Sequence, residues 1–301
     1  MTQEDSPPVT SHDLPDIDTL WNHSDPTGTE TKFKALLETE HARTNQAFRA
    51  EVLTQVARTQ GLQQRFDEAL ATLTQARSLI TTNMATAHVR ALLEHGRVIN
   101  SSGKPDDSIS YFEQALEAAN KAGQEAHAVD AAHMLGIVCK GPKAQAWNER
   151  ALKMANASQD PGARRWRAAL CNNLGWTYHA QGEHQRALEM FEQHLSIRTE
   201  ANHRFQMGIA RWSIAKMQRF LGAPELALET QRELLTWPER QNNAAEGYTQ
   251  EEVAECLLAQ ERADEAKPHF ARAWELLHTD IWLKRDEPER LERLKRLGSV
   301  T

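Results

Sequence analysis

Residues 168–195, AALCNNLGWTYHAQGEHQRALEMFEQHL, decide how this chain folds. The stretch has the pattern of two short amphipathic helices joined by a tight turn at Gly182. Ala187 and Phe191 are four residues apart, which places them on one helical face. Gly175 and Ala187 are small where two helix backbones have to approach closely, and Phe191 is large enough to fill the space beside them. The stretch therefore predicts a helical hairpin.

The hairpin resembles a tetratricopeptide repeat. The residues that carry the resemblance sit at the family's offsets: Leu174, Gly175, Tyr178, Gly182, Ala187 and Phe191. Cys171 stands where the family usually has Trp, His194 replaces a small residue late in the second helix, and the terminal proline is missing. The resemblance implies an all-α fold built from helix-turn-helix units, and a function in binding protein or peptide segments.

The small residues of this hairpin recur along the chain at nearly constant spacing. The first-helix column, with steps of 39 or 40 residues, is Ala57, Gly96, Gly136, Gly175, Ala215 and Ala254. The second-helix column is Ala69, Ser108, Ala144, Ala187, Ala227 and Ala266. A regular interval of this length is typical of a solenoid. We therefore expect an all-α, right-handed α-α superhelix of about six helix-turn-helix repeats with a C-terminal capping helix.

Two repeats depart from the pattern. The third has a turn about four residues short, at 140–142, and the polar Asn148 stands in its aromatic position. Trp147, one place away, is the candidate to fill that position. The fifth repeat has the polar Gln231 at the equivalent place. The fifth repeat therefore matches the pattern only weakly.

The composition and pattern of the sequence divide the chain into four segments. Residues 1–17 are rich in Pro, Ser and Asp and predict a flexible acidic tail. Residues 18–44 predict a leading cap with a helix from Thr29 to Ala42, and residues 45–281 hold the repeats. Residues 282–301 predict a C-terminal capping helix with one apolar stripe and one charged face. The stripe consists of Leu291, Leu294 and Leu297.

Charge and cysteine content exclude several protein classes. The net charge is −7, and residues 1–30 hold seven acidic residues and no Lys or Arg, so the rest of the chain is near neutral. A nucleic-acid partner would call for a basic surface. The three cysteines are far apart and form no zinc or disulfide pattern. We find no signal peptide and no apolar run of membrane-spanning length, so we expect a cytoplasmic protein without membrane contact. Homo-oligomerisation is left open.

The resemblance also indicates which residues would touch a ligand. In this family the first helices line a concave groove, and the positions three or two before the small residue, and one or four after it, face that groove. The resulting candidates are Arg58, Arg97, Asn100, His133, Asn172, Asn173, Trp176, Trp212, Glu252 and Glu255. They grade from basic to acidic along the chain. The alternative is that the charges pair across adjacent helices and the Trp residues pack between repeats.

We expect a non-enzymatic scaffold or adaptor that binds a protein or peptide segment in this groove, with no catalytic residue, cofactor or metal. Two alternatives remain: a sensor that binds a small molecule or signal peptide and changes assembly, and an enzyme with an unrecognised groove site. The thirteen His residues include no HExxH motif. Cys139 or Cys171 with His133 would be a nucleophile and base, but a Cys on an apolar helix face is usually a small core residue.

Overall fold

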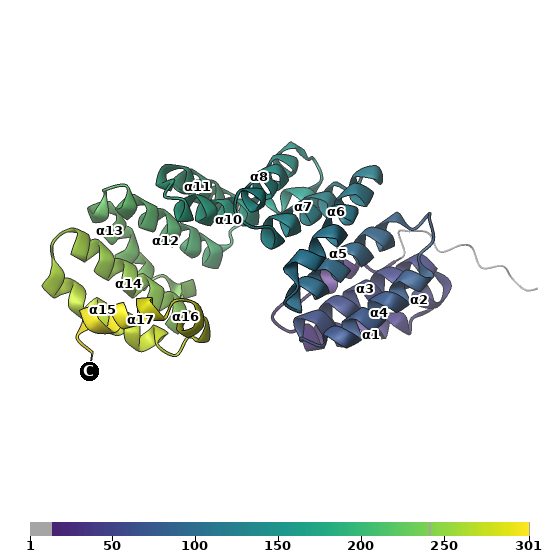
Figure 1. Ribbon diagram of the computed structural model, residues 1–301, viewed down its shortest axis with the longest axis horizontal. Helices are drawn as coiled ribbons and strands as arrows, with labels where there is room; N and C mark the ends of the chain where they lie inside the picture. The colour runs from purple at the N-terminus through teal and green to yellow at the C-terminus, as the bar shows by residue number, and fades with distance from the viewer. Residues whose placement is uncertain (1–13, 241, 301) are drawn as a thin grey trace, which may run out of the picture. The chain divides into compact units, whose positions relative to one another are not determined.

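In the computed structural model, residues 14–240 and 242–300 are described, and every regular element in these ranges is a helix. The chain divides into two compact units, here called unit 1 (Met1–Trp166) and unit 2 (Arg167–Thr301) (Figure 1). Nowhere in the described ranges is a helix both long and apolar enough to cross a membrane. The predicted all-α fold of tandem hairpins is confirmed.

Unit 1 contains nine α-helices among its described residues, preceded by one turn of 3-10 helix. Its elements are η2 (Ile17–Leu20), α1 (Pro26–Leu37), α2 (Glu40–Thr44), α3 (Gln46–Leu62), α4 (Phe66–Leu79), α5 (Ala85–Ser101), α6 (Pro105–Lys121), α7 (Glu125–Val138), α8 (Pro142–Ala157) and α9 (Pro161–Arg164). Three hairpins, α3/α4, α5/α6 and α7/α8, follow one another in the order expected from the columns.

Unit 2 contains three further hairpins, α10/α11, α12/α13 and α14/α15, and a C-terminal pair of short helices. Its elements are α10 (Arg167–Ala180), α11 (His184–Glu200), α12 (Arg204–Phe220), α13 (Pro224–Leu235), η3 (Pro238–Arg240), α14 (Asn243–Ala259), α15 (Ala263–Leu277), α16 (Ile281–Asp286) and α17 (Pro288–Gly298). The predicted total of about six hairpins is therefore confirmed in the described residues.

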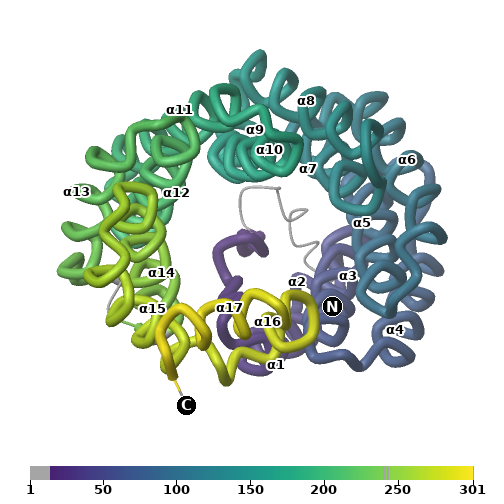
Figure 2. The backbone as a smooth tube through the Cα atoms, turned by 60° about the vertical axis from the view of Figure 1, so that its left-hand side comes forward, coloured from purple at the N-terminus to yellow at the C-terminus, as the bar shows by residue number. Residues whose placement is uncertain are grey.

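Within each unit the first helices of successive hairpins lie on one side and the second helices on the other (Figure 2). The first helices are α3, α5 and α7 in unit 1 and α10, α12 and α14 in unit 2. We call the face that they form the inner surface of that unit. Each hairpin turn contains one residue with positive φ, such as Gly182 at +77° and Glu261 at +61°. Gly adopts this conformation without steric cost, which explains why Gly marks most of these turns.

The two small-residue columns mark where the helices of a hairpin touch. A Cβ atom on Gly96 would lie 2.6 Å from Cε1 of Phe112, and one on Gly175 would lie 2.6 Å from Cε1 of Phe191. Both Phe rings are fully buried. The ring therefore occupies the volume that a first-helix side chain would need, so each hairpin requires a glycine or alanine opposite its large residue.

The third hairpin fills this position with Asn148, and the expectation for Trp147 is wrong. Asn148 is buried against Gly136, and its Nδ2 donates to the carbonyl oxygens of Gly136 at 3.3 Å and Ala144 at 3.0 Å. Trp147 points to the outer side, where the guanidinium of Arg150 lies 4.8 Å from its ring centroid. Two backbone carbonyls satisfy the NH2 group of this side chain, while its Oδ1 is buried without a hydrogen-bond partner.

The N-terminal region corrects two expectations. Residues 14–17 belong to the folded unit, because Leu14 packs against, and Ile17 is buried in, a cluster with Phe33. The flexible tail predicted for residues 1–17 is therefore too long at its C-terminal end, while residues 1–13 lie outside the described residues. The single helix expected from Thr29 to Ala42 is two helices, because α1 ends at Leu37 with Glu38 as its C-cap, and the side chain of Thr39 accepts from the Ala42 amide to begin α2.

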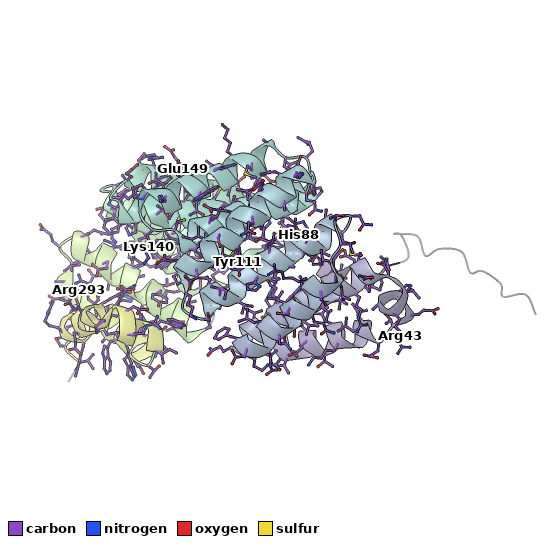
Figure 3. All side chains as sticks on the ribbon, turned by 45° about the vertical axis from the view of Figure 1, so that its right-hand side comes forward. Arg43, His88, Tyr111, Lys140, Glu149 and Arg293 are labelled. Atoms are coloured by element: carbon purple, nitrogen blue, oxygen red, sulfur yellow. The ribbon has the colours of Figure 1, made fainter. Side chains whose placement is uncertain are left out.

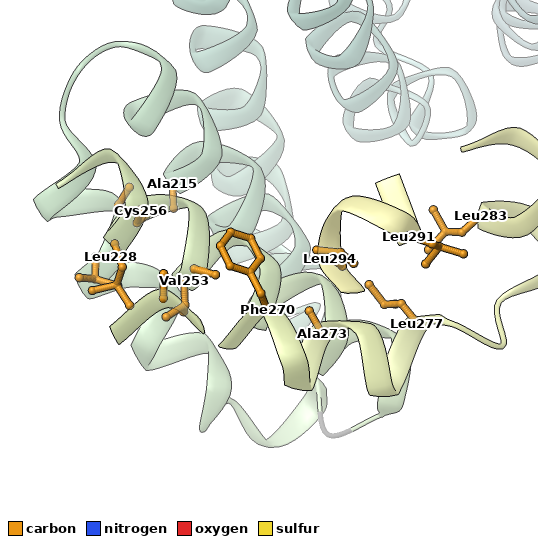
Figure 4. Close-up of a cluster of buried hydrophobic side chains, with 14 residues drawn as sticks. Ala215, Leu228, Val253, Cys256, Phe270, Ala273, Leu277, Leu283, Leu291 and Leu294 are labelled. Atoms are coloured by element: carbon orange, nitrogen blue, oxygen red, sulfur yellow. The ribbon is translucent and has the colours of Figure 1, made fainter. Parts of the chain in front are cut away.

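The C-terminal helices close the apolar core of unit 2. Leu291 and Leu294 of α17 pack into a buried cluster with Phe270 and Leu277 of α15 (Figure 4). Leu297 is partly buried against the same cluster. The apolar stripe read from the sequence therefore faces the core, as a capping element requires.

Candidate functional site

The ten predicted ligand-contact residues fall into two groups on different units. Unit 1 carries Arg58, Arg97, Asn100 and His133 on its first helices. Unit 2 carries Asn172, Asn173, Trp176, Trp212, Glu252 and Glu255 on its first helices.

The arginines of unit 1 are bound in a chain of ion pairs that crosses three successive first helices. Arg58 of α3 and Arg97 of α5 both contact Glu94 of α5, with Nη1 to Oε1 distances of 3.1 and 2.6 Å. Arg97 also contacts Asp130 of α7. Burial opposes ionisation of Asp130, but Arg97 holds the pKa of that carboxyl below its ordinary value. The expected basic end of the surface is therefore neutralised by its own acidic partners.

A pocket of about 180 Å³ opens beside this network. Asn100 lines it together with Arg58, Arg97 and Met134. His133 is buried next to Trp166, with ring centroids 5.1 Å apart, and burial lowers the pKa of its imidazole. His133 is therefore a core residue of unit 1 and does not line this pocket.

Unit 2 has a larger pocket, of about 420 Å³, with aromatic walls. Trp176 of α10, Trp212 of α12 and Tyr248 of α14 line it, one from each successive first helix. The ring centroids of Trp176 and Trp212 are 5.9 Å apart, and those of Trp212 and Tyr248 are 6.3 Å apart. Phe205, 40% exposed, and Ile209 extend the apolar lining along α12. We call this cavity the aromatic pocket.

Two cations border the aromatic pocket, and both already have carboxylate partners. Lys216 Nζ lies 5.2 Å from the Trp212 ring centroid and 2.6 Å from Glu252 Oε1. Arg290 of α17 lies over Tyr248, with Cζ 5.3 Å from the ring centroid, and donates to both oxygens of Glu251 at 2.8 and 2.6 Å. Their remaining hydrogens are available as donors at the rim, but their charges are balanced.

The predicted acidic residues of unit 2 are likewise paired. Glu252 is 1% exposed and contacts Lys216 and Arg219 of the preceding first helix. Burial opposes its ionisation, but these two cations hold the pKa of Glu252 below its ordinary value. Glu255 pairs with Arg293, a residue of α17 (Arg293 is labelled in Figure 3). The gradient from basic to acidic that the sequence suggested is therefore absent as a field of free charges.

The sequence identified Trp176 and Trp212 but missed Phe205, Tyr248 and Arg290. Tyr248 lies six residues before its small-column residue, outside the rows used for the prediction, although Trp176, Trp212 and Tyr248 are spaced by 36. That interval is the signal that could have found it. Asn172 and Asn173 lie one turn before Trp176, are half-buried, and do not line the aromatic pocket.

The cysteines lack the environment of a nucleophile. Cys171 and Cys256 are buried, and burial raises the pKa of the thiol of Cys171 to about 11 and that of Cys256 to about 12. A reactive cysteine needs a depressed pKa and access to substrate. Cys139 lines an outer groove between α6 and α8, beside Lys140 and Trp147.

Comparisons with known proteins agree with this architecture. A family model described as "Tetratricopeptide repeat" matches residues 140–200. The apo form of RapI is similar in structure, with a TM-score of 0.67, 14% identity, and coverage of 91% of this chain and 75% of that chain. BtubC (BKLC) from P. vanneervenii is similar with a TM-score of 0.56, 15% identity, and coverage of 73% of this chain and 90% of that chain.

NprR in complex with its cognate peptide NprX is similar with a TM-score of 0.50, 15% identity, and coverage of 94% of this chain and 81% of that chain. No curated protein matches the sequence. At these identities the structural likenesses establish the fold alone. The matched segment, the recurring small-residue columns and the hairpins that they form show that this chain has the tandem helical-hairpin fold of tetratricopeptide-repeat proteins, with the sequence match itself limited to residues 140–200.

Proposed function

We propose that this chain is a non-enzymatic scaffold that binds a peptide or an extended segment of another protein on the inner surface of its repeats. The aromatic pocket of unit 2 is the main contact. The observation that carries this proposal is the row of Trp176, Trp212 and Tyr248, which comes from three successive first helices and opens into one cavity of about 420 Å³.

The chemistry of this pocket suits side chains of a peptide. Trp and Tyr provide large, rigid contact areas at a low cost in conformational entropy, and they are enriched among the residues that dominate binding energy. Phe205 adds an exposed apolar edge. The paired cations Lys216 and Arg290 supply hydrogen-bond donors at the rim without a large net charge. We expect the pocket to prefer an apolar or aromatic side chain flanked by backbone carbonyls or a polar group.

A sensor is the second candidate, and one comparison favours it. NprR, whose fold this chain shares, was solved with its cognate peptide NprX. If this chain is a sensor, peptide binding should change its compactness or its state of assembly. Sedimentation velocity with and without bound peptide separates the two candidates. The sedimentation coefficient of a scaffold should change only by the added mass of the peptide, whereas that of a sensor should change further.

The experiment for the binding site compares two exposed phenylalanines on the same helix. Peptides selected on the immobilised parent chain from a displayed library are titrated by calorimetry against Phe205→Ala and Phe220→Ala. Phe205 lines the aromatic pocket, whereas Phe220, 44% exposed, lies at the other end of α12 against His184. Phe205→Ala should weaken binding at least tenfold and Phe220→Ala should leave it unchanged. Equal affinities for the parent and Phe205→Ala would assign the peptide to another face.

A further inference from the structure

The segment that precedes α1 lies against the inner surface of unit 1. Residues 14–25 form the short 3-10 turn η2, with the side chain of Asp16 accepting from the Asp18 amide, and then reach α1, which Asp25 caps. Its side chains reach two first helices of unit 1, because Asp18 contacts Arg90 of α5 and Trp21 contacts Gln55 of α3. It consequently covers the kind of surface on which a tetratricopeptide repeat would hold an extended ligand.

Two side chains of the segment contact the first helices in the manner of a bound peptide. Arg90 of α5 makes a bidentate pair with Asp18, with Nη1 to Oδ1 at 3.0 Å and Nη2 to Oδ2 at 2.9 Å. Trp21 Nε1 donates to Oε1 of Gln55 on α3 at 3.0 Å. The guanidinium carbon of Arg58 lies 5.3 Å from the Trp21 ring centroid. These are a fork-shaped ion pair, a hydrogen bond and a cation–π contact.

Two of the three receiving residues stand in the rows expected to face a ligand, and Arg90 is the exception. Arg58 stands one place after the small residue of its repeat and Gln55 two places before it, which are two of the groove-facing rows. Arg58 also lines the small pocket of unit 1. An external ligand that used Arg58 and Gln55 would therefore meet the chain's own Trp21 there.

We infer that the inner surface of unit 1 is a binding site for an extended segment of the pattern Asp-x-x-Trp, and that residues 14–24 are its intramolecular occupant. A partner segment with a carboxylate three residues before an aromatic side chain displaces that occupant. The site is separate from the aromatic pocket of unit 2, so this inference goes beyond the proposed function. It does not depend on the identity of the peptide bound there.

The spacing of the two anchors explains the pattern. A 3-10 turn has three residues per turn, so residues at i and i+3 project on the same side. Asp18 and Trp21 therefore reach the inner surface together, while Ile17 is buried in the apolar cluster with Phe33. The segment has two parts: an apolar anchor that caps the first hairpin, and an Asp18–Trp21 edge that resembles a ligand. The side chain of Asp18 is 42% exposed, so the carboxylate of a competing segment can approach Arg90 from solvent.

The short tether determines how the competition can be measured. Residues 22–25 join the occupant directly to α1, and a short tether gives an effective concentration on the order of millimolar. A peptide in solution must compete with this concentration. Weakening the internal Asp18 contact should therefore increase the affinity for an added peptide that keeps its own Asp and Trp.

The test uses a fluorescent peptide of residues 14–24 and measures its anisotropy with the full chain. Asp18→Ala should bind the peptide at least tenfold more tightly than the parent chain. Thr19→Ala is the matched control, since Thr19 lies in the same turn but its hydroxyl donates to the carbonyl oxygen of Asp16 within the segment. Adding Arg90→Ala to Asp18→Ala should abolish the gain, and a peptide carrying Trp21→Ala should fail to bind either chain.

An unchanged affinity in a folded Asp18→Ala chain would overturn the inference. So would a gain that survives Arg90→Ala but disappears with Phe205→Ala. The latter result would place the peptide in the aromatic pocket and leave the proposed function standing. If Asp18→Ala does not fold, hydrogen exchange on the parent chain decides. Millimolar unlabelled peptide should speed exchange at the amides of residues 17–22, whereas unchanged exchange there would overturn the inference.

Discussion

The ring of Phe191 lies where a side chain on Gly175 would have to be. An added Cβ would sit 2.6 Å from Cε1 and 2.7 Å from Cζ of that ring, which is closer than carbon atoms approach without displacement. Gly175 is therefore required by packing, whereas Gly182 in the adjacent turn is required by its backbone, because nothing lies within 4 Å of its added Cβ.

This difference separates two mechanisms of destabilisation. Gly175→Ala should lower the free energy of unfolding by about 1–3 kcal/mol through overpacking. Adding Phe191→Leu should recover part of that loss, because the ring is removed. Gly182→Ala should cost about 1–2 kcal/mol through its left-handed conformation, and Phe191→Leu should bring no recovery there. Urea denaturation of the four variants measures these effects, and equal behaviour at both glycines would contradict the assignment.

Removing the Glu252 carboxylate should destabilise unit 2. Glu252→Ala leaves Lys216 and Arg219 without their buried partner, and breaking such a pair costs about 3–5 kcal/mol. The exposed pair of Glu275 and Arg272 provides the control, since Glu275→Ala should cost less than about 1 kcal/mol. Chemical denaturation measures both variants. An equal decrease in the free energy of unfolding for both variants would show that the buried pair of Glu252 stabilises unit 2 no more than an exposed pair does.

The same carboxylate should make stability depend on acid. The pKa of Glu252 is held below its ordinary value of 4.5 in the folded chain. Its contribution is therefore present above pH 4.5 and is lost as the pH falls through the lower, folded pKa. The parent chain should lose stability in this range more steeply than Glu252→Gln, as followed by circular dichroism during acid titration.

His194 should give a separate pH dependence at milder acidity. Its side chain is 4% exposed, and burial, followed by the charge of Arg198, lowers the pKa of the imidazole from 6.5 to about 4. Between these values the unfolded chain binds a proton that the folded chain does not, so stability is full above pH 6.5 and falls as the pH drops toward 4. Each pH unit in this window corresponds to at most about 1.4 kcal/mol. His194→Gln should flatten the profile of stability against pH, and an unchanged slope in that variant would contradict the assignment.

Truncation should distinguish the anchored part of the N-terminus from what precedes it. Deleting residues 1–13 should leave the melting temperature nearly unchanged, because their sequence holds few apolar residues. Deleting residues 1–17 removes Ile17 from its buried cluster. This deletion should lower the melting temperature, since burying one such side chain contributes about 1.5–3 kcal/mol to the free energy of unfolding. Ile17→Ala is the matching point variant. Identical melting of the two truncations would show that the anchor is dispensable.

The helical hairpins could be predicted because the constraint behind them is local and repeated. Gly96 and Gly175 are small for one reason, the ring of a Phe two helical turns into the next helix, and a small residue recurs at this position every 39 or 40 residues. The third hairpin escaped prediction because Asn148 solves the same problem with hydrogen bonds to backbone carbonyls. Hydrophobic pattern alone carries no information about such a solution.

The candidate site was only partly predictable because its charges act in pairs across repeats. Read along one helix, Arg58 and Glu252 are ligand contacts; read across neighbouring helices, each has an opposite charge 36 residues away, in Glu94 and Lys216. The alternative that charges pair between adjacent helices describes these residues. Asp18 and Trp21 could not be placed from sequence, because an isolated segment has no periodicity to fix its register.

The pairs that join each repeat to the next also decide whether repeats are interchangeable. In unit 2, Lys216 and Arg219 of the fifth hairpin face Glu252 of the sixth, while Glu251 and Glu255 of the sixth face arginines of α17. A chain that lost the sixth hairpin, and set α17 directly on the fifth, would bring Arg293 against Lys216, which stands one place after its small residue as Glu255 does. Shape would permit that deletion, but charge would not. The order of these hairpins is thus set by charge as well as by shape, and loss of this repeat requires a compensating sign change at the one new junction that it creates.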